Sequence, residues 1–183
     1  PADSPWKTLN DLVAAAKALP GKISYSSSGI YGTTHTCFEM FAQAAGIKML
    51  HVPYKGGGPS MAALLGNEVN ITAQSPGVAN PHVKSGKVRM LGSWGGKRLP
   101  ALADIPTMKE LGYEAEFYIW AGLFAPAGLP QEVAATLRAT ARQVVQEQEF
   151  RRAMAGMNTP IDFRDGAEFD AFHLCETCGR IYW

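Results

Sequence analysis

The chain has 183 residues, of which 46% are apolar and 18% are charged, as in ordinary folded proteins. Its 17 Lys and Arg residues against 16 Asp and Glu residues give a formal charge of +1, and the basic residues are scattered along the sequence. Nucleic-acid-binding proteins usually carry a clustered basic surface, so we expect no nucleic-acid partner. No apolar run approaches the ~20 residues that a bilayer-spanning helix needs.

Strands and helices alternate through the first half of the chain. Apolar residues at helical spacing after Thr8 predict a helix that ends at Pro20 and Gly21, and the alternating segment 22–26 predicts a strand. The pattern continues through a helix from Thr34 to Ala45, a strand over 48–52, a helix over 59–67, a strand over 68–73, a helix over 77–87 and a strand over 88–94. This alternation is typical of right-handed crossovers, so we predict an α/β fold with a mostly parallel sheet.

The second half of the chain has a different character, and the composition changes around 115–120, where we place a domain boundary. The elements predicted after residue 100 are a helix from Thr107 to Leu111, an apolar strand over 117–130, a helical run from Gln131 to Met157 that is broken near 147–149, a short strand over 159–163 and a helix from Gly166 onward.

The turn between the first predicted strand and the helix from Thr34 is rich in small polar residues. Its candidate ligand-binding residues are Ser27, Ser28, Gly29, Gly32, Thr33 and Thr34. A helix N-terminus presents unpaired N–H groups and the positive end of the helix dipole, and open α/β sheets bind ligands at the carboxyl ends of their strands. The turn can therefore hold a carboxylate or a phosphate. A helix that binds nothing, with Thr33 or Thr34 as its N-cap, explains the hydroxyl groups equally well.

A catalytic role for the same turn needs a serine nucleophile with a base. The patterns G-x-S-x-G and G-x-x-x-x-G-K-[ST] are absent from the sequence, and His35 lies in the helix start rather than on a separate loop. We therefore expect His35 to be a cap or packing residue, and we expect no enzyme activity. A small α/β hydrolase stays as a competing class, which hydrolysis abolished by Ser27→Ala would support.

Two more strand-to-helix turns follow the first one. The glycines at 56–58 either let the backbone approach a ligand or form a flexible connection before Pro59 starts a helix. Gln74 and Ser75 stand at the carboxyl end of the next predicted strand, where their side chains can form hydrogen bonds. Three such turns at one edge of a parallel sheet favour a binding cleft over three unrelated loops.

The cysteines predict neither a cofactor nor a metal site. Cys37 lies on the predicted inward face of a helix, where a free cysteine is usually a small buried apolar residue. Cys175 and Cys178 form a C-x-x-C pair, but neither the strand-to-helix context of a redox motif nor two further zinc ligands is evident. We expect a chance or structural pair.

Three blocks of the sequence carry a resemblance to a known family. They are VPYKGGGPSMAALLGNEVNI, PHVKSGKVRMLGSWGGKRLPALADIPTMKELGY and GLFAPAGLPQEVAATL. In order and spacing these blocks resemble the Bug (Bordetella uptake gene) or TctC family of solute-binding receptors, the extracytoplasmic component of tripartite tricarboxylate transporters. The resemblance extends from about Ser4 to about Phe172.

The resemblance implies a periplasmic, two-lobed Venus-flytrap receptor without enzymatic activity. Such a receptor binds a small organic carboxylate, which is a di- or tricarboxylate, an aromatic acid or an amino acid, and its other partners are the membrane components of the transporter. The ligand-binding residues that the resemblance implies are Ser27, Ser28, Gly29, Tyr31, Gly32, Thr33, Thr34, His35, Gln74 and Ser75.

The sequence departs from the family pattern at several points. Tyr31 and Gly32 stand where the family usually has Gly followed by Ser or Thr, so a bulky phenol enters the anion-binding turn. Gln74 replaces an acidic or Asn residue and should change ligand selectivity. The C-x-x-C pair near the end of the chain is not a family feature.

The resemblance assigns residues 1–117 to the second lobe of the receptor and residues 118–183 to the first lobe. The family's first lobe begins with a segment that this sequence does not contain, so we expect a complete second lobe and an incomplete first lobe. Binding would then be weak unless a second copy of the chain completes the lobe in a homodimer. A truncated receptor with an interaction or signalling role is a further alternative.

Overall fold

The computed structural model describes residues 1–173. Contacts within the chain divide it into two units, Pro1–Ala121 and a second unit that begins at Gly122. The assignment of residues 1–117 and 118–183 to receptor lobes stays a prediction. The first unit contains the sheet, and it therefore contains the predicted ligand-binding turns.

Helix α1 (Leu9–Ala18) begins after Thr8, as predicted. The Thr8 hydroxyl accepts the Asp11 N–H at 3.2 Å, and the Asp11 carboxylate accepts the Thr8 N–H at 2.8 Å, which is a reciprocal capping box. The residues that α1 buries are Leu9, Leu12, Val13 and Ala16. Because they recur at helical spacing, α1 has one apolar face, and this face joins the core that contains Tyr25.

Three short parallel strands form the sheet, in the order β2-β1-β3. They are β1 (Ser24–Ser27), β2 (Leu50–Pro53) and β3 (Ile71–Thr72). The helices that alternate with them are α2 (Thr33–Ala45), α3 (Gly57–Leu65) and α4 (Pro76–Lys84). Both neighbours pair with β1 in parallel. The predicted α/β fold with a parallel sheet is confirmed, and the carboxyl ends of the three strands meet at one edge.

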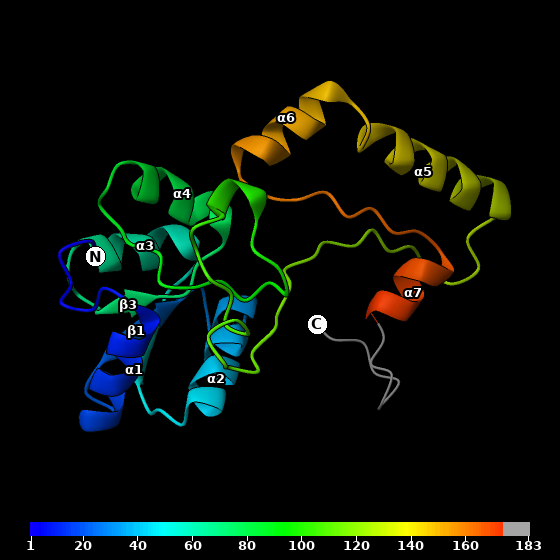
Figure 1. The fold of residues 1–183 in the computed structure, drawn as a ribbon. Coiled ribbons are helices and arrows are strands. Elements are labelled where there is room, and N and C mark those ends of the chain that lie inside the picture. Colours follow the sequence, from blue (N-terminus) through cyan, green and yellow to red (C-terminus); the bar gives the residue numbers. More distant parts are fainter. Residues whose placement is uncertain (174–183) are drawn as a thin grey trace. The chain divides into compact units, whose positions relative to one another are not determined.

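The central strand β1 is covered on both faces, because successive side chains of a strand point to opposite sides. Tyr25 is fully buried in a core shared with α1 and α2, whereas Ser26 faces Ser60 of α3. A second core gathers Met61, Ala63, Leu64, Val69 and Ala79 from α3, α4 and the approach to β3. Figure 1 shows α1 and α2 below the strands and α3 and α4 above them.

Two predictions for the first unit are wrong. Residues 88–94 form no strand. Ser93 alone in this segment bonds to the loop at 106–108, through an isolated bridge with Thr107, and a single bridge does not make a ladder. The predicted helix from Thr107 to Leu111 is a turn. There the Thr107 hydroxyl accepts the Glu110 N–H at 3.1 Å, and the Glu110 carboxylate accepts the Thr107 N–H at 2.8 Å. These two side chains therefore accept the backbone N–H groups of Thr107 and Glu110 within one turn. A short 3₁₀ helix covers Pro100–Leu102.

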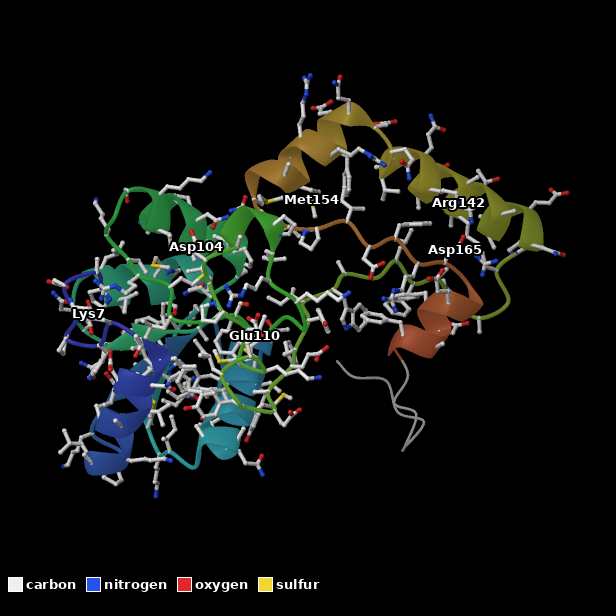
Figure 2. The ribbon with its side chains drawn as sticks, in the orientation of Figure 1. Lys7, Asp104, Glu110, Arg142, Met154 and Asp165 are labelled. Atoms are coloured by element: carbon white, nitrogen blue, oxygen red, sulfur yellow. The ribbon has the colours of Figure 1, made fainter. Side chains whose placement is uncertain are left out.

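The described part of the second unit contains α5 (Gln131–Val144), α6 (Gln148–Gly156) and α7 (Ala167–His173). The predicted break of the long helical run is confirmed, since α5 and α6 are separated at residues 145–147. Arg142 of α5 donates to the carboxylate of Asp165 at 3.0 Å (Figure 2). Neither α5 nor α6 buries a residue.

The two strands predicted in the second half of the chain, 117–130 and 159–163, are wrong. Both segments lack a ladder in the part of the chain that the structure describes. A strand exists only where a neighbour exchanges backbone hydrogen bonds with it, and apolar composition alone does not supply that neighbour. Cys175 and Cys178 lie outside the described residues.

Candidate functional site

Backbone hydrogen bonds join the turns that follow β1 and β2. The N–H of Tyr54 donates to the carbonyl of Ser27 at 3.0 Å, and the N–H of Gly56 donates to the carbonyl of Ser28 at 3.1 Å. Gly56 has φ 107, a backbone conformation that glycine adopts without steric cost. The parallel pairing of β1 with β2 is thus continued past the strands into the turns.

Gln74 joins the third turn to the second. Its side-chain Nε2 donates to the carbonyl of Gly57 at 3.1 Å and to the hydroxyl of Ser60 at 3.0 Å. A Cβ at Gly57 would lie 3.0 Å from Gln74 Oε1 and 3.2 Å from Val78, so this glycine permits close packing of the two turns. The amide nitrogen of Gln74 therefore points into the protein. Ser75 is the N-cap of α4 and makes no side-chain cap hydrogen bond.

A cluster of hydroxyl groups supports these turns beneath the edge of the sheet. Ser26 Oγ lies 2.8 Å from Thr72 Oγ1, and Ser60 Oγ lies 2.9 Å from Ser26 Oγ and 3.0 Å from Thr72 Oγ1. Ser26 and Ser60 are fully buried. Buried hydroxyl groups need partners, and here they satisfy one another while fixing the start of α3 against β1 and β3.

The turn between β1 and α2, residues 28–32, is closed by Thr34. The hydroxyl of Thr34 accepts the Ser28 N–H at 2.9 Å and lies 2.7 Å from the Ser28 hydroxyl. The N-cap of α2 is Gly32, which has no side chain to cap the helix, so the interpretation of Thr33 or Thr34 as N-cap is wrong. Among the described residues, no hydrogen bond uses the N–H of Thr33 or Thr34. Two backbone donors at the positive end of the α2 dipole are thus unused within the described part of the chain.

Tyr31 takes a conformation that usually belongs to glycine. Its φ is 58, in the left-handed region, and its side chain is 86% exposed. The Tyr31 N–H donates to Nδ1 of His35 at 2.9 Å, and the two rings are tilted with centroids 5.8 Å apart. The phenol therefore lies at the surface beside His35 and does not fill the turn.

His51 is a residue of the site that the sequence interpretation missed. Its Nε2 lies 2.7 Å from the hydroxyl of Ser27, and its ring stacks on His35 with centroids 4.0 Å apart and an interplanar angle of 5°. The Tyr25 ring also stacks with His51, with centroids 4.8 Å apart. The register of β1 and β2 could have revealed it, because His51 is the residue of β2 that pairs with Tyr25 of β1.

Two titratable groups surround the imidazole pair. The Tyr25 hydroxyl donates to the carboxylate of Glu39, and Nε2 of His35 lies 3.9 Å from the same carboxylate. Burial and the hydrogen bond to Glu39 raise the pKa of Tyr25, so its phenol stays a neutral donor. Burial lowers the pKa of His51, the neighbouring His35 lowers it further, and Glu39 opposes both effects.

Ser27 and His51 form the serine–imidazole contact that a hydrolase would need, but the serine cannot act as a nucleophile. Ser27 is 0% exposed, and its Oγ is also 3.1 Å from the carbonyl of Gly29 and 3.3 Å from the Gly29 N–H. A nucleophile must reach a substrate carbonyl, whereas this hydroxyl is enclosed by its own turn. The pair holds the turn in place.

No group of three or more His, Cys, Asp or Glu side chains within residues 1–173 is arranged to hold a metal ion. Cys37 is buried as predicted, and burial raises the pKa of its thiol to about 12. None of the helices in the described part of the chain is both long and apolar enough to cross a membrane.

Comparison with known proteins gives consistent results. The sequence profile of the tripartite tricarboxylate transporter family receptor, TctC, matches residues 1–169. A UPF0065 protein from the gbd 5' region of Cupriavidus necator is 36% identical over 172 residues, which are 94% of this chain and 52% of that protein. This chain spans about half the length of the curated relatives that it matches.

Solved structures share the fold. The periplasmic binding protein BugD has a TM-score of 0.73 and 32% identity, over 86% of this chain and 53% of BugD. A Rhodopseudomonas palustris protein solved with adipate has a TM-score of 0.77 and 27% identity, over 85% of this chain and 53% of that protein. The α/β architecture of this chain is therefore that of part of such a binding protein.

Proposed function

This chain belongs to the TctC family of tripartite tricarboxylate transporter receptors, which are binding proteins and not enzymes, and we propose on that premise that it captures a small organic carboxylate. The proposed place of capture is the periplasm, and the proposed recipients are the membrane components of the transporter. The adipate bound to one relative belongs to that protein. It makes a dicarboxylate the first ligand class to test here.

The observation that carries the proposal is the pair of unused backbone donors at the start of α2. The N–H groups of Thr33 and Thr34 are outside every hydrogen bond found among the described residues. They lie at the positive end of a helix of 13 residues. A carboxylate placed there would accept from both donors and would meet the favourable end of the dipole.

The predicted site residues divide into two proposed roles. Residues that we propose to line the ligand site at the edge of the sheet are Ser28, Gly29, Tyr31, Gly32, Thr33, Thr34, His35 and Ser75, with the N–H groups of Thr33 and Thr34 as the backbone donors. Ser27 and Gln74 are proposed supports, as is the hydroxyl of Thr34, because these side-chain atoms already bond within and between the turns. Residues 1–117 are proposed to be the second lobe of the receptor and 118–183 part of the first.

A charge reversal at the helix start tests the proposal. In Thr33→Asp, a carboxylate at the N-terminus of α2 competes with the ligand for the same donors and repels it, so we expect adipate binding to be abolished. Thr36→Asp is the matched control, because Thr36 is exposed on the same helix and its N–H already donates to Gly32. Isothermal titration calorimetry and thermal shift with adipate and a panel of carboxylates measure both variants.

The expected result is ligand-dependent stabilisation of the parent chain and of Thr36→Asp, without chemical turnover, and none for Thr33→Asp. Equal affinity in the three proteins would place the site elsewhere. Hydrolysis of an ester that was lost in Ser27→Ala would contradict the receptor function and support the hydrolase alternative.

A further inference from the structure

We propose that His51 is a positioning residue for the turn at residues 28–32 and that carboxylate binding at this turn is coupled to uptake of one proton by His51. The proposal rests on the proposed function, because it needs an anion at the start of α2. It goes further in naming a residue on another strand and a proton that enters with the ligand.

Ser27 has three polar neighbours and only one proton to donate. Its Oγ lies 2.7 Å from His51 Nε2 and 3.1 Å from the carbonyl of Gly29, and the Gly29 N–H donates to it at 3.3 Å. If Nε2 of His51 is unprotonated, Ser27 can donate to His51 and leave the Gly29 carbonyl without this donor. If Nε2 carries a proton, His51 donates to Ser27, and Ser27 donates to Gly29. A proton on Nε2 of His51 therefore selects the arrangement that ties the turn to β1. The neutral ring can place its proton on either nitrogen, whereas the protonated ring always carries one on Nε2, so protonation of His51 secures this arrangement.

The second imidazole, His35, has one ring nitrogen committed to a backbone hydrogen bond. Nδ1 of His35 accepts the Tyr31 N–H at 2.9 Å, so the proton of its neutral ring belongs on Nε2, on the side of Glu39. A proton added to Nδ1 would point at that N–H and break the hydrogen bond. His51 has no such restriction at Nε2, because a serine hydroxyl can either donate or accept. We therefore propose His51 as the ring that takes up the proton.

The charges around His51 make this proton responsive to an anion. The titratable groups that face the ring are Tyr25 from β1 and His35 and Glu39 from α2. Burial and His35 lower the pKa of His51, which favours the neutral ring when no ligand is bound. An anion bound at the start of α2 adds a negative charge near the stacked rings, which favours the protonated ring and raises that pKa.

Linkage fixes the sign of the pH effect. Binding that raises the pKa of His51 takes up a proton, so affinity must increase as pH falls through the pKa of the bound state toward the pKa of the free state. Between the pKa values of the free and bound protein, the association constant should change by up to about tenfold per pH unit, which is the limit for one proton. Below the pKa of the free protein the dependence should vanish, because the ring is then charged in both states.

The test combines calorimetry with NMR on the 183-residue chain. Adipate and acetate, the latter as a minimal carboxylate, are titrated between pH 5 and 8 in buffers of different ionisation enthalpy, which reports the number of protons taken up. In parallel, ¹⁵N-edited NMR follows the tautomer and pKa of His51 with and without each anion. We expect a fractional proton uptake that reaches no more than one, and a His51 pKa that rises on binding.

Three variants separate positioning from simple packing. His51→Gln keeps a donor that can reach Ser27 but cannot titrate, so it should bind with an affinity that no longer depends on pH. His51→Leu fills the space without a donor and should bind more weakly at every pH. His82→Gln alters a histidine of α4 and should retain the full pH dependence.

The outcomes distinguish this proposal from the proposed function. Binding of either anion with no proton uptake, or a pH dependence unchanged in His51→Gln, would overturn the proton coupling while leaving the receptor function intact. Absence of binding by both anions in the parent chain would count against both. A His51 whose Nε2 shows no hydrogen bond in the free protein would overturn the positioning role irrespective of ligand.

Discussion

Helix α2 of the first unit buries Cys37, Phe38 and Phe41, whereas α5 of the second unit buries none of its residues. Both helices are amphipathic, but the apolar face of α2 has a sheet to cover, and Val133 and Leu137 of α5 are 45% and 42% exposed. Amphipathic spacing therefore predicts where a helix forms in this chain, and it does not predict what the apolar face contacts.

The same contrast holds for extended segments. Strand β1 lies between two parallel neighbours and is buried at three of its four residues, whereas residues 117–130 are apolar and form no ladder. Leu123 in that segment is 76% exposed. Backbone hydrogen-bond partners, rather than apolar composition, decide which extended segments of this chain become strands. The candidate site depends on these partners, because its turns continue the strand pairing.

The largest expected difference between the units is in the cost of removing an apolar side chain. Phe41 is 1% exposed in the core of the first unit, so Phe41→Ala should lower the free energy of unfolding by about 3–5 kcal/mol. The matched change in the second unit, Leu137→Ala, should alter it by no more than about 0.5 kcal/mol. Urea unfolding followed by circular dichroism measures both. A large loss in Leu137→Ala would show that α5 is covered by a partner in solution.

A smaller difference is expected at two residues in the left-handed region. Tyr31 of the first unit has φ 58 and Asn158 of the second has φ 51. Tyrosine is strained there and asparagine is tolerated, so Tyr31→Gly should stabilise the fold by about 1 kcal/mol, whereas Asn158→Gly should change it by a few tenths. Tyr31→Ala is the control that removes the phenol and keeps the strain. If Ala and Gly stabilise equally at position 31, the phenol and not the backbone is responsible.

The sequence predicts much of the first unit, for physical reasons that act locally. Helical spacing and a capping box define α1, a left-handed glycine at 46 ends α2, and alternation with helices predicts three parallel strands. What the sequence misses depends on distant partners. The strand expected over 88–94 makes only one bridge, from Ser93 to a loop. The contact of His51 with Ser27, 24 residues away in the sequence, requires the register of β1 and β2.

The sequence predicts where the strand-to-helix turns lie, and only partly how their side chains bond. The Ser27–His35 turn lies at the carboxyl edge of the parallel sheet, as predicted, and ligand binding at that edge stays a prediction. The roles of individual hydroxyls were not predictable, because Thr34 could cap the helix or close the turn, and packing decides for the latter. Gln74 is likewise predicted to contact a ligand, but its side-chain amide donates to the buried hydroxyl of Ser60.

The central claim is that the start of α2 holds a carboxylate, and an amide NMR titration tests it most directly. Adipate is added to the ¹⁵N-labelled chain while the backbone N–H signals of residues 1–121 are followed. The account predicts saturable shifts that are largest at Ser28, Thr33 and Thr34 and that are absent in Thr33→Asp. Saturable shifts confined to other residues, with these three amides unmoved, would contradict it.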